Sequence, residues 1–356
     1  KNVFVENADH AIRIVLTSPV LSPLKFNGLK STGKSEFSFT TISLGYEAEL
    51  GLEAAINRVV EQAISASKEG TTILFLSDRE INQGQLVIPA AMATGAVHHG
   101  LIKQGLRTES NLVIETGDAR DAHHFAVLIG FGATAVYPWL TYEVLADMHR
   151  TGELLGDPLQ SNQNFRKGIR KGLLKILSKM GISTIASYRG SQLFEGIGLA
   201  TDVVDLCFCG LSSRIQGAGF EEFQEDLARN AANAWKPRKG LDQGGLLKYV
   251  HGGEYHAFNP DVITTIQDAV QTGSQAAYDK YADLVNKRPA ATLRDLLAIK
   301  TTNSISIDEV EPVEAIYPRF DSAAMSLGAL SPEAHEALAQ AMNELGGNSN
   351  SGEGGE

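Results

Sequence analysis

Apolar runs alternate with amphipathic stretches through the middle of the chain. Short apolar runs, which predict strands, lie at residues 72–77, 111–115 and 134–137. The stretches before and between them carry apolar residues at helical spacing, and they lie at residues 52–68, 87–104 and 122–129. Strands that alternate with helices in this way predict a parallel sheet, either closed as a barrel or open and doubly wound.

The same alternation continues more loosely towards the C-terminus. A basic amphipathic helix is expected at 163–180, with Gly181 ending it. Strands are then expected at 182–186 and 203–208, with a helix at 191–197 between them. After a glycine-rich stretch, helices are expected at 260–270, 274–285 and 292–298. The acidic stretch 301–314 lacks apolar periodicity, and we interpret it as part of a linker.

The C-terminal segment 323–356 predicts one strand, one helix and a glycine-rich loop. The strand is expected at 323–327. Ser331 is placed to cap a helix, and Pro332 to begin it, ahead of apolar residues at helical spacing. One strand and one helix cannot bury both faces of the strand, because a parallel strand needs neighbours on each side. We therefore expect the first βα unit of a truncated domain.

Composition narrows the class of protein. The chain has 356 residues, of which 43% are hydrophobic and 21% charged, enough for two ordinary domains or one large α/β domain. The net charge of -11 argues against a nucleic-acid surface, and no apolar run approaches the roughly 20 residues that cross a membrane. Two cysteines cannot form a disulfide framework, so a reducing compartment is expected. An initiator methionine is missing, which suggests an internal piece of a longer polypeptide.

Several residue groups invite a chemical interpretation, and each has a structural alternative. Cys207 and Cys209 face the same side of an expected strand, but two thiolates are too few for a zinc site, so no metal is expected. The histidine pairs 98–99 and 123–124 cannot chelate on their own, because adjacent residues on a helix diverge by about 100°. The glycines within 190–198 could present backbone donors to an anion, although tight turns need glycine as well.

Charged residues gather in the sequence around the second histidine pair. Glu115, Asp118, Arg120 and Asp121 precede His123, at the end of an expected strand. Strand ends in α/β folds are where sites and partners collect. One interpretation is that these residues form a catalytic site. We favour a hydrogen-bonded polar cluster that contacts a neighbouring domain.

Longer motifs, taken together, resemble a single family. They are 77–79 (SDR), 115–120 (ETGDAR), 171–184 (KGLLKILSKMGIST), 252–256 (GGEYH) and 352–356 (GEGGE). In this order, and over nearly the whole chain, they resemble the large chain of glutamate synthase. In that family a glutaminase domain precedes a central domain, an FMN-binding barrel with an iron-sulfur cluster, and a β-helix. The resemblance implies a central domain at 1–300, a linker at 301–322 and the start of the FMN barrel at 323–356. The expected fold is therefore an incomplete, barrel-like α/β layer of parallel strands, followed by the first unit of a TIM-type barrel.

The resemblance also implies a reaction divided between two sites. Glutamine is hydrolysed at one site and ammonia crosses the interior to the other, where reduced FMN converts 2-iminoglutarate, formed from 2-oxoglutarate, into glutamate. The glutaminase nucleophile of the family is an N-terminal cysteine, whereas this chain begins with Lys1. The cluster cysteines are expected beyond Glu356. We therefore expect no complete catalytic site, no FMN and no iron-sulfur cluster in this chain alone.

Site residues implied by the resemblance fall into two groups. The residues expected beside FMN, once the barrel is complete, are Ala324, Met325 and Ser326. The candidates for the ammonia path or for interdomain coupling are Glu353, Glu356, Glu115, Arg120 and His123.

The expected role of this piece is scaffold and wall of the ammonia conduit. Two alternatives stay open, a self-contained flavin-dependent oxidoreductase and a non-catalytic assembly or regulatory module. The expected partners are the glutaminase domain and the rest of the FMN barrel. Ferredoxin or a subunit that oxidises NAD(P)H is expected to supply the electrons. The cytoplasm or a plastid stroma is the expected location.

Overall fold

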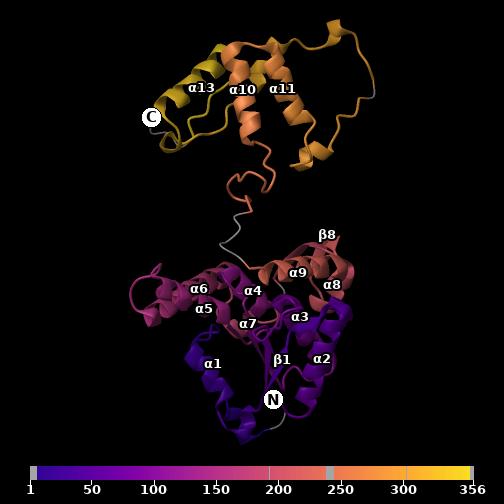
Figure 1. The fold of residues 1–356 in the computed structure, drawn as a ribbon, viewed down its shortest axis with the longest axis vertical. Coiled ribbons are helices and arrows are strands. Elements are labelled where there is room, and N and C mark those ends of the chain that lie inside the picture. The colour runs from indigo at the N-terminus through magenta and orange to yellow at the C-terminus, as the bar shows by residue number, and fades with distance from the viewer. Residues whose placement is uncertain (1–5, 192, 238–243, 302, 353–356) are drawn as a thin grey trace. The chain divides into compact units, whose positions relative to one another are not determined.

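The computed structural model describes residues 6–191, 193–237, 244–301 and 303–352, and Figure 1 traces the chain. The chain divides into two compact units, Lys1–Lys239 and Gly240–Glu356. This division lies before the linker expected at 301–322, and the three-part division of the sequence stays a prediction. Within the described residues, no helix is long and apolar enough to cross a membrane.

A four-stranded parallel sheet forms the centre of the first unit. Its strands, in spatial order, are β1 (Phe39–Ser43), β3 (Ile73–Ser77), β5 (Asn111–Glu115) and β6 (Ala135–Tyr137). The helices that connect them are α2 (Leu52–Lys68), α3 (Ala90–Lys103) and α4 (Ala122–Gly130). The parallel α/β sheet predicted from the alternating pattern is thus confirmed.

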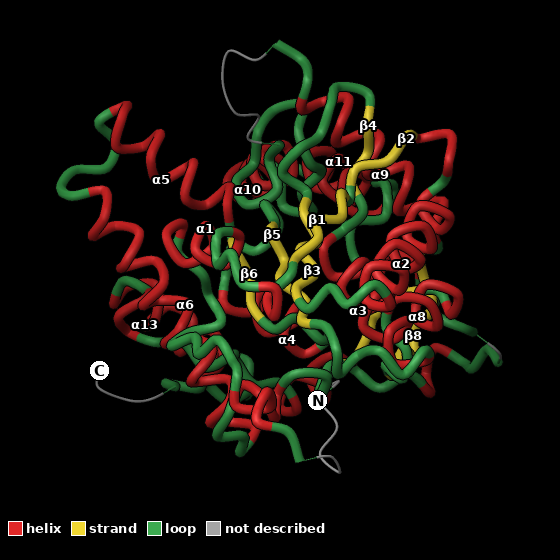
Figure 2. The backbone as a smooth tube through the Cα atoms, turned by 90° about the horizontal axis from the view of Figure 1, so that it is seen from below, coloured by secondary structure: helices red, strands yellow, loops and turns green. Residues whose placement is uncertain are grey.

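Both faces of this sheet are buried, which explains why its inner strands are continuous apolar runs. Leu74 of β3 packs into a core with α2, α3 and α4, whereas Phe75 faces α1 (Pro23–Lys30) on the other side. Phe26 of α1 stacks on Tyr137, with ring centroids 4.1 Å apart. Figure 2 shows the strands between α1 and the pair α2 and α3. Helix α1 packs on the face opposite α2, α3 and α4, and the four described strands form an open sheet, not a closed barrel.

The remaining elements of the first unit flank this sheet. The described residues of this unit also form an antiparallel pair, β2 (Gly45–Glu47) with β4 (Gln85–Val87), and a parallel pair, β7 (Glu195–Leu199) with β8 (Ser212–Ala218). The further helices are α5 (Trp139–Thr151), α6 (Pro158–Met180), α7 (Ile185–Tyr188), α8 (Thr201–Cys207) and α9 (Phe220–Ala234). Short 3-10 turns occupy Ala8–Ala11, Ser35–Phe37 and Ala48–Leu50. Gly181 ends α6 with a φ of 69°, as predicted.

Two elements predicted between 182 and 197 are wrong. The expected strand 182–186 leads into α7, because the Thr184 hydroxyl accepts a hydrogen bond from the Ser187 N–H and so caps a helix. The expected helix 191–197 is replaced by β7, which pairs with β8. A Cβ at Gly217 would lie 2.3 Å from the Gly198 carbonyl oxygen. Glycine is therefore needed there for the close approach of two strands.

The strand predicted at 203–208 is also wrong, since these residues belong mainly to α8. Val203, Val204 and Cys207 are buried together, and this spacing marks one face of a helix. β-Branched residues favour strands only weakly, and packing overrides the preference. A connection between the parallel strands β7 and β8 requires a crossover, which α8 supplies.

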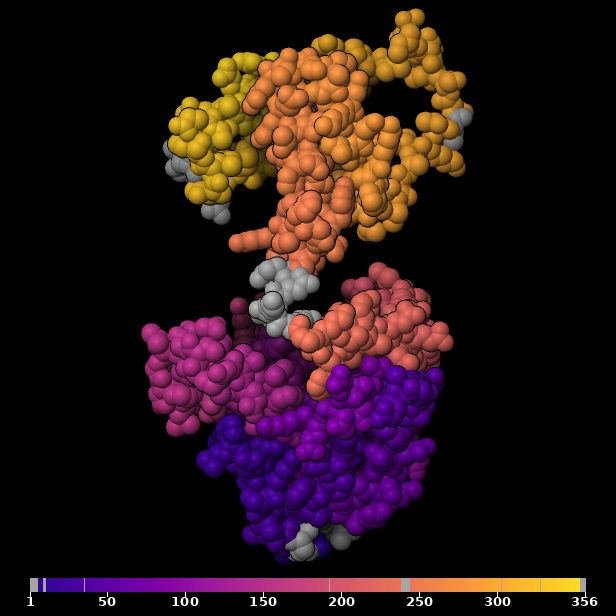
Figure 3. Space-filling model, viewed as in Figure 1, coloured from indigo at the N-terminus to yellow at the C-terminus, as the bar shows by residue number. Residues whose placement is uncertain are grey.

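The second unit consists of helices and loops. Its α-helices are α10 (Pro260–Thr272), α11 (Gln275–Asn286), α12 (Val313–Ile316) and α13 (Pro332–Glu344). Its 3-10 turns are Leu293–Leu296, Ile307–Glu309, Tyr317–Arg319 and Leu327–Ala329, so the helix predicted at 292–298 is only one such turn. Leu297 and Ile299 are 78% and 93% exposed, so this stretch buries little apolar surface. Figure 3 shows the surface of the second unit in orange to yellow.

The C-terminal segment contains the predicted capped helix but not the predicted strand. The Ser331 hydroxyl accepts a hydrogen bond from the Ala334 N–H at 3.3 Å, and Pro332 begins α13. Residues 323–327 form no strand, because the parallel pairing of this segment is a single bridge between Asp321 and Asn348. A strand needs a hydrogen-bonded neighbour along its length. The described residues of this segment supply only that bridge.

Candidate functional site

Four polar side chains are buried where the central strands end. Ser77 and Glu115 are the last residues of β3 and β5, and Asp78 and Thr116 follow them directly. The carboxyl ends of parallel strands lie at one edge of a sheet, so the topology brings these side chains together. Asp78 is 5% exposed and Glu115 is 3% exposed. Carboxylates are seldom buried unless they are paired, which makes this edge the candidate site.

Asp78 is held by donors from two other segments. Its carboxylate accepts hydrogen bonds from the Thr116 hydroxyl at 2.5 Å, the Gly117 N–H at 3.0 Å and the Trp139 indole N–H at 2.6 Å. Burial raises the pKa of Asp78, while these three donors act in the opposite direction by stabilising the ionised form. Because Trp139 begins α5, Asp78 links β3 both to the loop after β5 and to α5. We interpret it as a structural clamp.

Glu115 is surrounded by one hydroxyl and two cations. It accepts a hydrogen bond from the Ser77 hydroxyl at 2.9 Å. Its Oε2 lies 3.5 Å from Lys30 Nζ, and its Oε1 lies 3.7 Å from Arg79 Nη1. Arg79 also contacts Glu143 of α5, with Nη2 and Oε1 2.8 Å apart. Lys30 and Arg79 thus form ion pairs with Glu115, and Arg79 with Glu143 as well. These pairs compensate the buried negative charge of Glu115.

A polar cavity of about 490 Å³ opens beside Glu115. Helix α1 contributes Asn27 and Lys30 to its lining, and β1 contributes the hydroxyls of Thr41 and Ser43. The complete lining is Phe26, Asn27, Lys30, Thr41, Ser43, Ser77, Arg79, Glu80 and Glu115. These amide, hydroxyl and charged groups can orient a small polar molecule. The described lining contains no cysteine and no histidine that would act as a nucleophile or a neutral-pH base.

The two other candidates near this edge are exposed and stand apart from the cluster. The side chain of Arg120 is exposed, and its backbone N–H donates to Nδ1 of His124 at 3.2 Å. His123 lies in the first turn of α4, with its ring centroid 6.3 Å from that of Phe194. Glu115 is thus the one candidate of the three that belongs to the buried cluster. Sequence reasoning did not find Lys30, the ion partner of Glu115, since nothing local places α1 at this edge. Asp78 was part of the motif 77–79, but its contact with Trp139 of α5 could not be predicted.

The residues expected beside FMN lie in the second unit. Ala324 and Ser326 are exposed, and Met325 is half-buried next to the loop that carries Gly352. A Cβ at Gly352 would lie 3.1 Å from the Met325 carbonyl oxygen. The described residues of this segment form no strand of a barrel. Glu353 and Glu356 lie outside the described residues.

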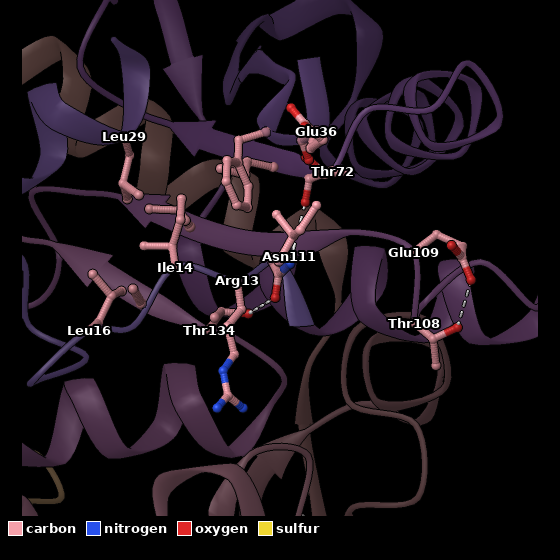
Figure 4. A pocket seen from close by; sticks show the side chains of 15 residues that line it. Arg13, Ile14, Leu16, Leu29, Glu36, Thr72, Thr108, Glu109, Asn111 and Thr134 are labelled. Atoms are coloured by element: carbon pink, nitrogen blue, oxygen red, sulfur yellow. Dashed lines mark hydrogen bonds between the residues drawn. The ribbon is translucent and has the colours of Figure 1, made fainter. Parts of the chain in front are cut away.

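A second pocket lies at the opposite, amino-terminal ends of the central strands (Figure 4). It measures about 540 Å³. Its apolar lining residues are Ile12, Ile14, Leu16, Leu29, Phe37, Ile73, Val113 and Ala135. In Figure 4, the side chains of Thr72, Asn111 and Thr134 lie between an apolar side, with Ile14, Leu16 and Leu29, and the pair Thr108 and Glu109. Ligands of open α/β sheets bind outside the carboxyl ends of the strands, so this position argues against an active site.

His98, the first residue of the histidine pair 98–99, is a hydrogen-bond partner of Arg107. The Arg107 guanidinium donates to Nδ1 of His98 at 2.8 Å, and to the carbonyl oxygens of Ser110 at 2.6 Å and Gly132 at 2.7 Å. Burial, aided by the Arg107 charge, lowers the pKa of His98 to about 3. Burial also lowers the pKa of Arg107 to about 10. A neutral His98 that accepts at Nδ1 is a structural partner of Arg107.

Neither the cysteines nor other side chains form a metal site in the part of the chain that the structure describes. Cys207 is buried in α8, and burial raises the pKa of its thiol to about 12. A thiol with so high a pKa is unreactive near neutral pH.

Comparison with known proteins points to one family. A family model described as glutamate synthase central domain matches residues 1–200, and one described as conserved region in glutamate synthase matches residues 256–356. The chain is 39% identical over 347 residues to the glutamate synthase [NADPH] large chain of Bacillus subtilis, covering 97% of this chain and 23% of that protein. It is 40% identical over 362 residues to that of Azospirillum brasilense, covering 100% and 24%. It is 39% identical over 376 residues to the chloroplastic ferredoxin-dependent glutamate synthase of Spinacia oleracea, covering 100% and 23%. The chain thus spans about a quarter of the length of these relatives.

Among solved structures, flavocytochrome b2 with sulfite bound matches with 14% sequence identity and a TM-score of 0.31. The match covers 63% of this chain and 46% of that one. A likeness of this size carries no argument about function.

Proposed function

The chain belongs to the glutamate synthase family, and from this premise we propose that it forms the central domain and the start of the FMN-binding barrel of a glutamate synthase large chain. That enzyme makes glutamate from 2-oxoglutarate and glutamine-derived ammonia. The observation that carries the proposal is the match to large chains along the whole sequence. The names of relatives include NADPH, ferredoxin and NADH, and we propose one of these as the source of electrons.

Within that enzyme, this chain serves as scaffold and as a wall of the ammonia conduit. The cavity beside Glu115 supports this role, since its hydroxyl and carboxylate oxygens can accept hydrogen bonds from a passing ammonia molecule. Compensation of Glu115 by Lys30 and Arg79 disfavours trapping of ammonium, because the carboxylate is already paired. Arg120 and His123 are exposed on the loop and helix after β5, where they can contact a neighbouring domain.

When bound in the complete barrel, FMN would supply the electrons that reduce 2-iminoglutarate. Ala324 and Ser326 would contribute small side chains to its cradle, and Met325 its backbone, only when the other strands of the barrel are present. This chain alone is therefore proposed to be inactive. The cytoplasm or a plastid stroma is the proposed location, and the spinach relative is chloroplastic.

The test is glutamate formation by the complete large chain that contains these residues. With glutamine, 2-oxoglutarate and an electron donor, the complete chain should form glutamate, whereas this chain by itself should form none. A complete chain that hydrolyses glutamine but never reduces 2-oxoglutarate would contradict the proposal.

Glu353 and Glu356 give a second test in the same assay. If either lines the ammonia path, Glu353→Gln or Glu356→Gln should raise the ratio of glutamine hydrolysed to glutamate formed. Unchanged ratios in both variants would remove these two residues from the path.

A further inference from the structure

Among the described residues, one edge of the central sheet is covered by another segment of the chain, and the other edge is not. Beyond β6, the segment before α1 covers the edge, since Val20 forms a parallel bridge with Val136 and the Leu21 N–H donates to the Val136 carbonyl at 2.9 Å. At the other edge lies β1, which among the described residues pairs only with β3. An uncovered edge strand presents unpaired N–H and C=O groups and is a template for another strand.

The hydrogen bonds of β1 identify the groups that face outward. The Ser38 carbonyl accepts from the Ile73 N–H at 3.0 Å, and the Leu44 N–H donates to the Ser77 carbonyl at 2.8 Å. In a parallel ladder, alternate residues direct their backbone groups to opposite neighbours. The even-numbered residues of this stretch therefore face β3, and the odd-numbered residues 39, 41 and 43 present their N–H and C=O groups at the free edge.

This edge lies at the floor of a groove. On one side, a polar stripe is formed by Arg58, Gln62 and Ser65 of α2 and by Glu69, which follows the helix. Together with residues 40–43, this stripe lines a space of about 580 Å³. On the other side, Asn27 and Lys30 of α1 line the cavity of about 490 Å³, which shares Thr41 and Ser43 with the first space. Walls on both faces leave room for one extended segment, whereas the broad edge of a second sheet would meet α1 and α2.

Arg58 of α2 indicates which chemical group an extended segment in this groove would carry. Its Nη2 donates to the Gly45 carbonyl at 2.8 Å, but its Nε is buried without a hydrogen-bond partner among the described residues. Glu69, the acid at the far end of the stripe, lies about three turns from Arg58 and accepts from the Ser65 hydroxyl at 3.1 Å. A buried guanidinium N–H that lacks an acceptor costs free energy, and a carboxylate is its best partner.

We propose that the free edge of β1 docks one extended acidic segment, which adds to the sheet as a further strand and places a carboxylate on Arg58. This inference rests on the proposed function, because the segment comes from the part of the large chain outside these residues. That part is large, since the chain covers only 23% and 24% of two relatives. The main-chain bonds supply affinity, and the carboxylate fixes the register.

Amide hydrogen exchange, resolved to single residues, tests the docking in the complete large chain and in this chain alone. The amides of Phe39, Thr41 and Ser43 should exchange about tenfold more slowly in the complete chain, the change expected for one added hydrogen bond of about 1.4 kcal/mol. Thr40 and Ile42 face β3, so they should be protected in both and serve as internal controls. Equal exchange of the three outward amides in both proteins would overturn the docking. Glutamate formation by the same complete chain reports separately on the proposed function.

Thr41→Pro sharpens this test, because proline is tolerated on an edge strand and removes only an outward N–H. In the complete chain it should abolish the added protection of Phe39 and Ser43, while Thr41→Val, which keeps the N–H, should preserve it. Arg58→Gln should weaken that protection more than Arg58→Lys does. If Phe39 and Ser43 stay protected in Thr41→Pro, the proposal is overturned. It is also overturned if the protection appears in this chain alone as its concentration rises, a result that would identify a second copy as the occupant.

Discussion

Asp78 shows how a single buried residue can organise the carboxyl edge of the sheet. Asp78→Asn should lower the free energy of unfolding by about 2–3 kcal/mol, because an amide NH₂ would face donors where a carboxylate oxygen now accepts. Urea titration of this chain measures the change. Asp118→Asn is the matched control, since Asp118 is exposed and its contact with the Ala90 N–H is 3.4 Å long. Equal losses in the two variants would contradict the clamp.

His98 should give the chain a pH-dependent stability. Its pKa is lowered to about 3 in the folded state, against about 6.5 in the unfolded chain. Between these values the unfolded state binds a proton that the folded state does not, so this contribution is full above about pH 6.5 and is lost as the pH falls towards 3. His98→Asn keeps an acceptor for Arg107 and should flatten the loss between about pH 6.5 and pH 5. Urea titrations at several pH values test this, and identical slopes in both proteins would refute it.

Asp295 should show the same direction of pH dependence as His98, because its pKa is also lower in the folded state. Hydrogen bonds from the Ala291 N–H at 2.9 Å and from Arg288 at 3.1 Å lower its pKa to about 2. A lowered carboxylate pKa contributes stability that is present above the unfolded value of about 3.9 and is lost as the pH falls through about 2. Asp295→Asn should remove this part of the acid transition of the second unit, followed by circular dichroism. An unchanged acid transition would contradict the assignment.

At the scale of elements, the contact between α3 and α8 depends on one glycine. A Cβ at Gly95 would lie 1.9 Å from the Cys207 carbonyl oxygen, so Gly95→Ala must push the helices apart. The expected loss of unfolding free energy is about 1–3 kcal/mol, typical of overpacking. Gly168→Ala in α6 is the control, because a Cβ added there would have no atom within 4 Å, and it should stabilise by about 0.5–1 kcal/mol. A neutral Gly95→Ala in urea titration would mean that the two helices are not in close contact.

Element prediction succeeded where one pattern dominated and failed where tertiary packing decided. Strand β5 and helix α2 have the predicted bounds, because a continuous apolar run and a clear helical period leave little ambiguity. Strand β1 was missed, since an edge strand that contains Thr40 and Thr41 lacks such a run. The sequence predicts a strand where α8 lies, because Val203 and Val204 favour strands locally. Of the candidate site, Glu115 could be found from its place after an apolar run, whereas Lys30 arrives through the fold of α1.

For the whole molecule, the flavin-enzyme and scaffold interpretations predict different colours of the purified chain. A self-contained flavin-dependent oxidoreductase would purify yellow, whereas the scaffold role predicts a colourless protein with no flavin absorbance. An assembly module would bind an isolated glutaminase domain without any effect of Arg120 or His123 on ammonia transfer. An absorbance spectrum of this chain, purified with FMN in excess and then desalted, separates the first two.

The most direct measurement of the conduit is the ratio of glutamine hydrolysed to glutamate formed by the complete large chain. Arg120→Ala and His123→Ala are the informative variants, because both side chains are exposed and their loss should leave the fold intact. If this chain is a wall of the conduit, the ratio should rise above that of the unmodified enzyme while glutamate formation from added ammonium stays unchanged. A ratio equal to that of the unmodified enzyme in these variants and in Glu115→Gln would contradict the proposed role.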